Sequence, residues 1–340
     1  MIKLQSDYNS GAHPKIMEAI NKYNNDSFIC YGEDEITNEA KKEILKYLKT
    51  DSDIYFVVGG TSANQIAISS ALKPYEGVLA LPSGHINVHE AGAIEATGHK
   101  VLTLSDSLLI NPKEVKKNLE EYAKNDVKTH MVKPQMVYVS IPGENGLVLP
   151  KKDLEELYRI CQEKGVYLYI DGARMAYALS SEYSLEDFAK NSDIMYIGGT
   201  KCGLLFGEAI VINNPKLKED FSYNIKQRGG LLAKGFLLGI QFKALFEDGL
   251  YMEIGRLANN MSSYARSELS KLGMKFYYNS LTNQIFPIAS KKLYEKLEKE
   301  VSLEKWFDLD KDNLVFRIVT TYKTKRKEID YLVKIIKENI

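Results

Sequence analysis

The chain has 340 residues, of which 44% are hydrophobic and 26% charged, a composition that suits a large core and leaves room for two domains. Its 45 basic residues balance 45 acidic residues, which excludes the strong net field that attracts nucleic acid or an anionic membrane. We therefore expect a small molecule as the partner, with no nucleic acid and no membrane.

The N-terminal residues, Met1 to Asp7, lack the apolar core of a signal peptide, and no apolar run approaches the length of a membrane span. Cys30, Cys161 and Cys202 are odd in number and widely separated, which argues against a disulfide framework or a zinc site. These features predict a cytoplasmic protein.

Segments of helical period alternate with short apolar strands in the first third of the chain. Ile16, Ala19, Ile20 and Tyr23 fall at helical spacing, so a helix is expected to begin at Pro14. This alternation is typical of a doubly wound α/β fold. The elements predicted in chain order are an extended segment over 1–13, helices from Pro14 and over 35–48, a strand over 54–58, a helix over 62–72, a strand over 78–81, a helix near 86–97 and a strand over 100–104.

The middle of the chain continues this pattern, and its strands are expected to be parallel. Parallel strands end at one edge of a sheet, which is where ligands bind in open α/β folds. The predicted elements are strands at 136–141, 166–170, 194–197 and 207–212, with a short helical stretch near 174–180 and an amphipathic segment at 185–190.

The chain changes character near residue 245. A long helical stretch from about 232 to 271, interrupted at Asp248-Gly249, leads into a mixture of short strands and helices. We predict a large domain over 1–245, with an extended N-terminal segment, and a smaller α+β domain over 246–340. The elements expected in the smaller domain are strands at 274–278, 284–288, 304–308 and 314–319 and helices at 291–299 and 325–338.

Two strand ends near the middle of the chain carry an acid and an amine. Asp171 follows the strand at 166–170, and Lys201 follows the strand at 194–197 and a glycine pair. Pyridoxal phosphate needs a lysine to bind its aldehyde and an acid beside its ring nitrogen to keep the pyridinium protonated. The pair therefore predicts a pyridoxal phosphate site. The alternative from spacing alone is that Asp171 caps a turn and Lys201 is a solvated loop lysine.

The turn Gly59-Gly60-Thr61 lies between a predicted strand and a predicted helix. Glycine lets the backbone approach an anion closely, the free amides of the first helical turn point toward it, and the Thr61 hydroxyl can donate as well. The turn lacks the lysine of a P-loop and the spacing of a dinucleotide fingerprint. It predicts a phosphate site, with a plain capped turn as the alternative.

His85 and His89 follow the strand at 78–81. An imidazole at this place can lie flat on a cofactor ring and exchange protons at neutral pH. The spacing of the two histidines would suit a metal on a helix, but no third ligand is evident and we expect no metal. The alternatives are a hydrogen-bonded histidine at a helix start for His85 and a partly buried surface residue for His89.

Taken together, these motifs resemble the threonine aldolase and β-eliminating lyase family of fold-type I pyridoxal phosphate enzymes. The resemblance runs nearly the full length of the chain and rests on the order and spacing of the motifs. They are Ser6-Asp7, Gly11-Ala-His-Pro14, Tyr31-Gly-Glu-Asp34, Gly59-Gly-Thr61 with Asn64, Gly84-His85-Ile86, Glu90-Ala-Gly92, Asp171-Gly-Ala-Arg174, Gly198-Gly-Thr-Lys201, Gly207-Glu-Ala209 and Phe316-Arg317-Ile-Val-Thr320.

The resemblance implies an aspartate aminotransferase-like fold and a role for each matched residue. Lys201 would hold the cofactor, Asp171 would pair with its ring nitrogen, and His85 would stack on its ring and act in catalysis. Gly60 and Thr61 would bind the cofactor phosphate. The other implied contacts are Arg228 with the phosphate, across a subunit interface, and Ser6, Tyr31, Arg174 and Arg317 with the substrate.

Some of these implied contacts have plainer alternatives. A guanidinium suits a carboxylate because it makes two parallel charge-assisted bonds, which favours the two substrate arginines. Without the resemblance, Arg317 would be interpreted as a charge at a strand edge. Arg228, in the loop Lys226-Gln-Arg228-Gly-Gly230, would be interpreted as solvated.

The sequence departs from the commonest family pattern at two places. Gln5 precedes the Ser-Asp pair where an arginine is frequent, and Ser140-Ile-Pro-Gly-Glu-Asn-Gly146 replaces a region with an active-site histidine. No histidine follows His130. The group that moves the proton is therefore left open among His85, Glu90, Glu144, Tyr31 and a bound water.

The resemblance implies an aldehyde-lyase that cleaves the Cα–Cβ bond of β-hydroxy amino acids, giving glycine and acetaldehyde from L-threonine or L-allo-threonine. It also implies a homodimer or homotetramer. The alternatives are a pyridoxal-phosphate-dependent β-eliminating lyase that acts on another amino acid, and a noncatalytic binding protein of the same fold. The intact Lys201 and Asp171 count against the second alternative.

Overall fold

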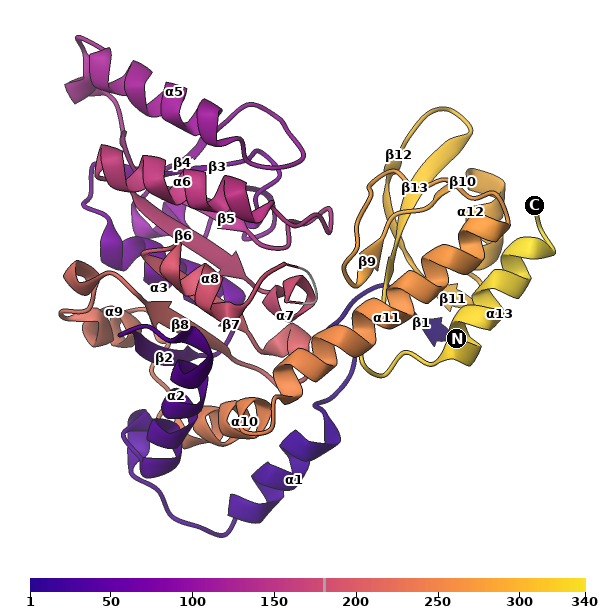
Figure 1. Cartoon of the computed structure of the whole chain (residues 1–340), viewed down its shortest axis with the longest axis horizontal. Coiled ribbons are helices and arrows are strands. Elements are labelled where there is room, and N and C mark those ends of the chain that lie inside the picture. Colours follow the sequence, from indigo (N-terminus) through magenta and orange to yellow (C-terminus); the bar gives the residue numbers. More distant parts are fainter. Residues whose placement is uncertain (180–181) are drawn as a thin grey trace.

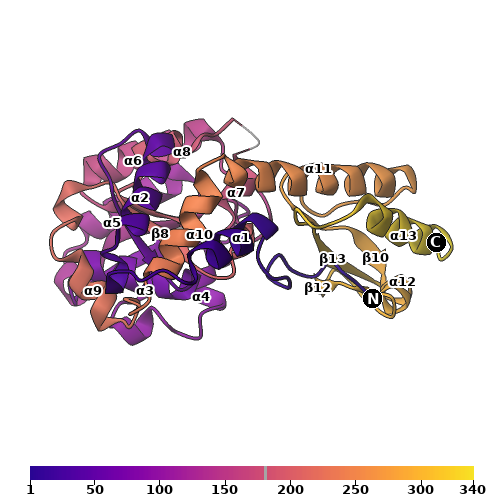
Figure 2. The ribbon, with the colours of Figure 1, turned by 90° about the horizontal axis from the view of Figure 1, so that it is seen from below.

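A computed structural model describes residues 1–179 and 182–340 of the chain. It has a large sheet and a small sheet, which the long helix α11 (Leu250–Lys271) connects (Figure 1). Figure 2 shows the two parts side by side, with α11 along one edge of both. Among the described helices, none is both long and apolar enough to span a bilayer.

The large sheet is mostly parallel. Its strands are β2 (Asp53–Val57), β3 (Glu76–Ala80), β4 (Val101–Thr103), β5 (Lys133–Ser140), β6 (Tyr167–Gly172), β7 (Ile194–Gly198) and β8 (Glu208–Ile212). Their order across the sheet is β2-β8-β7-β6-β5-β3-β4, and β8 runs antiparallel to both of its neighbours. The other adjacent pairs are parallel. This confirms the predicted doubly wound α/β architecture.

Helices cover both faces of the large sheet, since residues on alternate strand positions feed two separate apolar clusters. One cluster includes side chains of α5, α6 and α8, and the other includes side chains of α3 and α9. The helices of the larger part are α1 (Pro14–Tyr23), α2 (Glu35–Leu48), α3 (Gly60–Ala71), α4 (His85–Val88), α5 (Pro112–Lys124), α6 (Lys151–Lys164), α7 (Met175–Ala178), α8 (Leu185–Lys190), α9 (Phe221–Gln227) and α10 (Phe236–Phe246).

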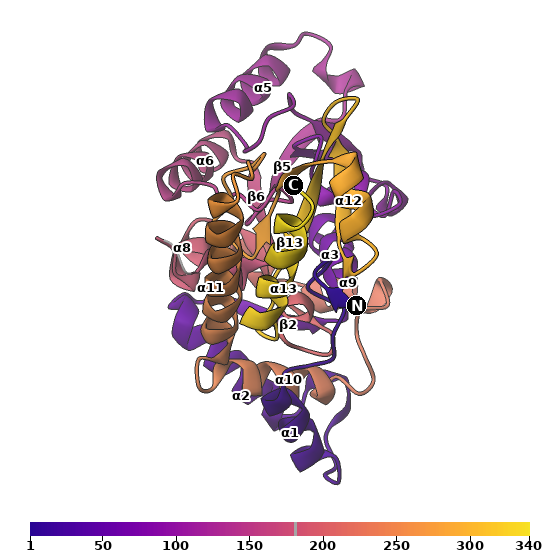
Figure 3. The same cartoon turned by 90° about the vertical axis from the view of Figure 1, so that its right-hand side faces the viewer.

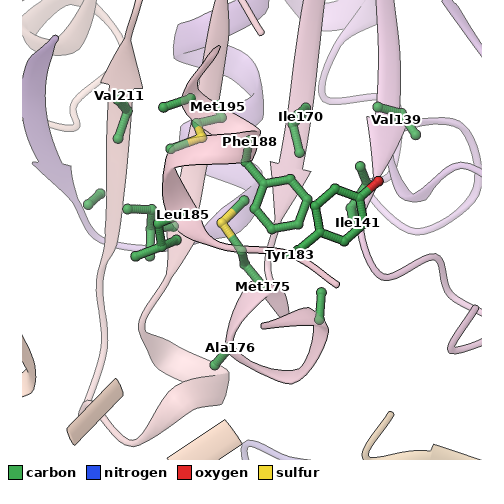
Figure 4. Packing of buried hydrophobic residues seen from close by; sticks show 14 of the residues in the cluster. Val139, Ile141, Ile170, Met175, Ala176, Tyr183, Leu185, Phe188, Met195 and Val211 are labelled. Carbon is green, nitrogen blue, oxygen red and sulfur yellow. The ribbon is translucent and has the colours of Figure 1, made fainter. Parts of the chain in front are cut away.

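The packing under α7 and α8 holds the end of the sheet that carries the candidate site. Phe188 of α8 stacks on Tyr183, with ring centroids 4.4 Å apart, and both lie against buried strand residues such as Ile170 (Figure 4). Met175 of α7 enters the same cluster. This packing fixes β6, which contains Asp171, and the segment after it, which contains Arg174.

The smaller part is an antiparallel sheet covered by helices, and both chain termini lie beside it (Figures 1 and 3). The N-terminal strand β1 (Ile2–Lys3) pairs in parallel with β11 (Val301–Ser302), so the first residues pack on this part. The remaining elements are β9 (Gln284–Ile285), β10 (Ile288–Ser290), β12 (Glu304–Asp308), β13 (Asn313–Val319), α12 (Lys291–Leu297) and α13 (Arg326–Lys337). The proposed division at residue 245 stays a prediction.

Helix α11 touches α7 through its backbone. A Cβ atom at Gly255 would lie 2.1 Å from the carbonyl oxygen of Ala176, which is closer than any side chain allows. Glycine at this position therefore permits a direct helix-to-helix contact. The helix begins after the predicted break, because Gly249 has a φ of 69° that ends the preceding helical segment.

Three predicted elements differ from the structure. The helix expected near 86–97 ends at Val88, because Ala91 and Gly92 both have positive φ angles that a helix does not accept. The strand expected at 274–278 is one isolated bridge between Phe276 and Pro287. That proline also divides the strand expected at 284–288 into β9 and β10, because it cannot donate to a ladder.

Helices α5, α6 and α9 are absent from the sequence predictions. A signal for α5 was present, since Asn111 caps the helix and Pro112 occupies its first turn. Gly165 ends α6 in the left-handed conformation that is common at a helix C-terminus. The predicted helical stretch near 174–180 forms α7 over 175–178, and residue 180 lies outside the described residues.

Candidate active site

A cavity of about 280 Å³ lies at the C-terminal ends of the parallel strands, where ligands bind in such sheets. Asp171 reaches it from the end of β6, and Lys201 from the 3₁₀ turn Thr200–Cys202 that follows β7. Gly60, Thr61 and His85 also line it. The structure thus brings together the five residues predicted to hold the cofactor from within one chain. We call this space the Lys201 cavity.

The start of helix α3 forms one wall of the Lys201 cavity. Gly59 precedes the helix and makes no side-chain cap, so the first-turn amides have no capping oxygen. A Cβ atom at Gly60 would come within 3.1 Å of the Tyr196 hydroxyl, so a larger residue would crowd that hydroxyl at the cavity wall. Thr61 is exposed beside it. This arrangement has the chemistry of an anion site, with amide donors and a hydroxyl.

Three donors hold the Asp171 carboxylate, which is buried. The Tyr138 hydroxyl donates to its Oδ2 at 2.6 Å and the Asn64 amide at 3.3 Å. The backbone N–H of Ala173 donates to Oδ1 at 3.0 Å. Burial and the neighbouring Asp171 hold the pKa of Tyr138 well above its usual value, so the hydroxyl keeps its proton and stays a donor. The carboxylate is thereby fixed in one orientation inside the cavity.

A chain of hydrogen bonds connects Asp171 to His85. Asn64 donates to Glu90 Oε1 at 2.6 Å, and the same oxygen lies 2.7 Å from His85 Nδ1. Burial alone lowers the pKa of His85, but the hydrogen bond with Glu90 and the nearby charges of Glu144 and Asp171 outweigh it. The pKa of His85 is therefore raised, and its ring is held in place by a fully buried carboxylate.

A row of three buried tyrosines lies beneath the cavity. The rings of Tyr138 and Tyr169 are 5.8 Å apart and those of Tyr169 and Tyr196 are 6.5 Å apart. Their hydroxyls approach Asp171, Asn64 and the Gly60 turn, respectively. In the sequence these strands are recognisable only as short apolar runs. The available signal was one tyrosine in each of three adjacent strands, with all three side chains on the same face of the sheet.

Lys201 has a buried acid as a neighbour. Glu208, at the start of β8, lines the Lys201 cavity and accepts from the Gly199 N–H at 2.8 Å. Burial raises the pKa of Glu208 to about 7, although the Gly199 and Thr200 hydrogen bonds and Lys201 act in the opposite direction. On the other side, the Lys201 ammonium lies 5.8 Å from the centre of the Tyr8 ring. Neither Glu208 nor Tyr8 was a predicted site residue.

The N-terminal segment runs past the predicted substrate residues. Asp7 forms a buried ion pair with Arg174, with Oδ2 2.7 Å from Nε and Oδ1 3.1 Å from Nη2. Burial raises the pKa of Asp7, but Arg174 and Lys201 outweigh it, so the pKa is lowered. Ser6 is buried beside this pair. The contact of Ser6 with the substrate stays a prediction, and the pairing of Asp7 with Arg174 had no counterpart among the sequence predictions.

Arg317 lies on β13 in the smaller part and is also paired. Its guanidinium contacts the Glu304 carboxylate, donates to Gln284 Oε1 at 2.8 Å and stacks over the Trp306 ring at 5.0 Å. Its Nη2 lies 3.5 Å from the carbonyl oxygen of Gln5, next to Ser6. Arg317 does not line the Lys201 cavity in this arrangement.

Ser6 and Arg174 do not line the Lys201 cavity either, and Tyr31 and Arg228 lie elsewhere on the chain. Tyr31 is 45% exposed and lines a separate depression, with the Lys226 ammonium 4.8 Å from its ring centre. Arg228 donates to the Ser69 hydroxyl, near the far end of α3 from Gly60. Their predicted contacts with the substrate and the phosphate therefore need a second subunit, and they stay predictions.

The residues of the Lys201 cavity fit pyridoxal phosphate. The cavity offers an amine, a fixed carboxylate and a helix start with space for an anion. Among the residues that the structure describes, the buried Oε2 of Glu90 has no hydrogen-bond partner, so it can accept one more hydrogen bond. Lys201, Asp171, His85 and the Gly60-Thr61 turn would hold the group in the orientation that the sequence predicts.

Comparisons with known proteins agree on one family. The model of the family described as beta-eliminating lyase matches residues 3–288. A low specificity L-threonine aldolase from Pseudomonas sp. (strain NCIMB 10558) is 31% identical over 302 residues, which cover 87% of this chain and 86% of that protein. A solved structure of threonine aldolase from Leishmania major has a TM-score of 0.95 and 38% identity, with 99% of each chain covered. Aspartate aminotransferase from Thermus thermophilus, at 15% identity over 100% of this chain and 92% of that one and a TM-score of 0.71, shares the fold.

Proposed function

The chain belongs to the beta-eliminating lyase family, and from this membership we propose that it cleaves L-threonine and L-allo-threonine to glycine and acetaldehyde. It is a pyridoxal-phosphate-dependent lyase that breaks the Cα–Cβ bond of a β-hydroxy amino acid. The observation that carries the proposal is the single cavity that joins Lys201, Asp171 and the Gly60-Thr61 turn. The relatives named above support the choice of substrate.

Each part of the cavity has a separate task in this proposal. Pyridoxal phosphate, when bound, supplies an electron sink that weakens the bonds to the substrate Cα. Lys201 would hold it through its amine, and Asp171 would keep its ring nitrogen protonated, since Tyr138, Asn64 and Ala173 fix the carboxylate. His85 would cover its ring, because the bond with Glu90 fixes the imidazole.

Arg174 and Arg317 would hold the substrate carboxylate together with the Ser6 hydroxyl. A guanidinium suits this task because it forms paired, charge-assisted hydrogen bonds in a fixed plane. Asp7 orients Arg174 through two of its nitrogens and leaves Nη1 for another carboxylate. The buried setting of both arginines, 4% and 5% exposed, strengthens such a bond relative to one in water.

The test is the release of acetaldehyde and glycine from both threonine diastereomers. We expect both to be cleaved, because a flexible group or a water takes the hydroxyl proton where the commonest family pattern has a fixed histidine. Ammonia and a keto acid without glycine would move the enzyme to β-elimination. A strong preference for one diastereomer would be consistent with the aldolase activity but would exclude low stereoselectivity at Cβ. Protein that shows no visible band with added pyridoxal phosphate would favour a binding protein.

We also propose a homodimer or homotetramer in which Tyr31 and Arg228 complete the cavity of a neighbouring subunit. The position of both residues away from their own cavity supports this. Mixing Lys201→Ala and Arg228→Ala chains, each inactive alone, should restore activity, because one mixed site would contain both native residues. Mixed chains that stay inactive would count against the shared site. The cytoplasmic location stays a prediction from the sequence.

A further inference from the structure

A second cavity of about 290 Å³ adjoins the Lys201 cavity. It lies between the larger and smaller parts and is lined by aromatic side chains of the smaller part, Tyr277, Tyr278, Trp306 and Phe307. Glu144 lines both cavities. Its side chain is 17% exposed and follows the end of β5, the strand next to the one that carries Asp171. A carboxylate therefore stands at the boundary between the predicted cofactor space and an apolar space.

The contact between Glu144 and Arg174 is loose. Glu144 Oε2 lies 3.6 Å from Arg174 Nη1, which is an ion pair but too long for a hydrogen bond. Asp7 holds the other side of the same guanidinium at 2.7 and 3.1 Å. Glu144 thus lies at the nitrogen of Arg174 that Asp7 does not hold, and this is where a substrate carboxylate would bind. An incoming carboxylate would displace Glu144 from Arg174 while keeping Asp7 in place.

Four other acids and bases are less available than Glu144, and one of them, Glu208, is buried and accepts from the Gly199 N–H. His85 has a raised pKa and is bonded to Glu90, so it tends to keep its proton. Glu90 is fully buried and receives bonds from both His85 and Asn64. Tyr31 lies in a different depression of the same chain. Glu144 is partly exposed, weakly held and directed into the space between the two cavities.

We propose that Glu144 is the catalytic residue that takes the proton of the substrate β-hydroxyl after the substrate carboxylate has replaced it at Arg174. This inference rests on the proposed function. The β-substituent of the substrate would extend toward the aromatic cavity, because Glu144 separates that cavity from Lys201. Substrate binding and the freeing of the base are then one event, since both depend on Arg174.

The step balances in atoms and electrons. The O–H bond breaks and its proton moves to a Glu144 carboxylate oxygen, while its electron pair forms the C=O bond of the aldehyde. The Cα–Cβ bond breaks, and its electron pair stays with the glycine fragment. Delivery of a proton to Cα and loss of the proton from Glu144 complete the cycle, so threonine gives acetaldehyde and glycine with no other reactant.

The experiment compares two reactions in Glu144→Gln holoenzyme. Cleavage of L-threonine needs the hydroxyl proton to leave, whereas exchange of a glycine Cα proton with deuterated solvent does not. We expect kcat for cleavage to fall by about 100-fold or more, the size of a general-base contribution. Glycine exchange, followed by NMR, should fall by less than about threefold. Glu144→Asp, which keeps the carboxylate, should recover part of the cleavage.

A binding measurement tests, without turnover, whether a substrate carboxylate replaces Glu144 at Arg174. Glycine titrated into the holoenzyme and followed by visible absorbance should bind Glu144→Gln as tightly as wild type or more tightly, since no carboxylate competes for Nη1. The matched control is Glu120→Gln on α5, which removes the same charge from a surface pair with Lys164 of α6. We expect this control to behave as wild type in all three measurements.

Several outcomes would overturn the proposal. They are cleavage by Glu144→Gln within about threefold of wild type, an equal loss of cleavage and glycine exchange, and glycine binding weakened by about tenfold or more. The last two would make Glu144 a structural or substrate-binding group. Wild-type protein that releases no acetaldehyde would overturn the proposed function as well, whereas a failure confined to the variant overturns the Glu144 proposal alone.

Discussion

The two ends of the candidate site are built in different ways. At the cofactor end, Asp171, Asn64, Glu90 and His85 form one hydrogen-bonded chain, and its members come from the large sheet, its helices and the loop after α4. At the substrate end, Arg174 and Arg317 are paired with acids from other segments. The first set is connected by hydrogen bonds before any ligand binds, whereas the second already contains carboxylates in places where a substrate carboxylate would bind.

This difference separates residues that orient from residues that exchange partners. A fully bonded carboxylate such as Asp171 loses little freedom when a ligand arrives, because its position is already fixed. An arginine that contacts Glu144 or Glu304 must release that acid to bind a substrate. Changes at the cofactor end should therefore affect turnover, and changes to the two arginines at the substrate end should affect substrate affinity.

The largest expected effect is that of Lys201→Ala at the cofactor end. Loss of the amine should abolish cleavage, because no other lysine lines the described part of the Lys201 cavity. The measurement is acetaldehyde release, together with borohydride reduction and peptide mapping. Wild-type protein should carry a pyridoxyl label on Lys201, and the variant should carry none. A label on another lysine of the wild-type protein would refute the assignment.

Asp171→Asn should give the next largest effect. The amide has the same shape, so pyridoxal phosphate should still bind and give a visible band, but the neutral group no longer stabilises a protonated ring nitrogen. We expect kcat to fall by about 100-fold with little change in KM, as is typical when an electrostatic contribution is lost. Unchanged turnover, or loss of cofactor binding in place of lost turnover, would contradict the orienting role.

A pair of variants tests the substrate end. Arg317→Lys should raise KM for L-threonine by about tenfold or more, because an ammonium cannot replace the paired bonds of a guanidinium, and a lost charge-assisted bond costs about 1.5–3 kcal/mol. Glu304→Gln should leave KM unchanged or lower it, since Arg317 is then released more easily. If Glu304→Gln raises KM as much as Arg317→Lys does, the acid orients the arginine and does not compete with the substrate.

The smallest expected effect concerns the free energy of unfolding and its dependence on the ionisation of Glu208. Burial raises the pKa of Glu208 from the ordinary value of 4.5 to about 7, so the folded state keeps a proton that the unfolded state loses in this range. The stability that Glu208 contributes is present below about pH 4.5 and is lost as pH rises to about 7. At about 1.4 kcal/mol per pH unit, this amounts to about 3 kcal/mol.

Denaturant unfolding of the cofactor-free protein at several pH values measures this effect. The difference in unfolding free energy between Glu208→Gln and wild type should change between pH 5 and pH 8 in favour of the variant, because only wild type must ionise a buried acid. Comparison with the variant cancels the titration of the other groups. A difference that does not vary with pH would show that Glu208 ionises normally in the folded protein.

The cofactor end was largely predictable from the sequence. Apolar runs located the strands, and parallel strands end at one edge, so Asp171 and Lys201 had to face the same side. The glycine turn before α3 likewise followed from its place between a strand and a helix. The fold class was confirmed for the same reason. The error near 86–97 arose because a left-handed residue such as Ala91 leaves no mark in an amphipathic pattern.

The substrate end was less predictable because its pairings join distant segments. Asp7 and Arg174 are separated by 167 residues, and Arg317 meets the carbonyl of Gln5 across 312. No local pattern reveals such partners. The resemblance named Arg174 and Arg317, but not the acids that hold them. The roles predicted for Tyr31 and Arg228 stay untested, since they depend on another subunit.

The backbone contact between Gly255 and Ala176 connects the tilt of α11 to the distance between Arg174 and Arg317. Helix α7 begins directly after Arg174, and the far end of α11 packs on α13 and β9 of the part that carries Arg317. A tilt of α11 about the Gly255–Ala176 contact would therefore change the distance between the two guanidinium groups without a substitution in the pocket. Substitutions along α11, outside the pocket, could therefore change which substrate carboxylates fit between the two arginines.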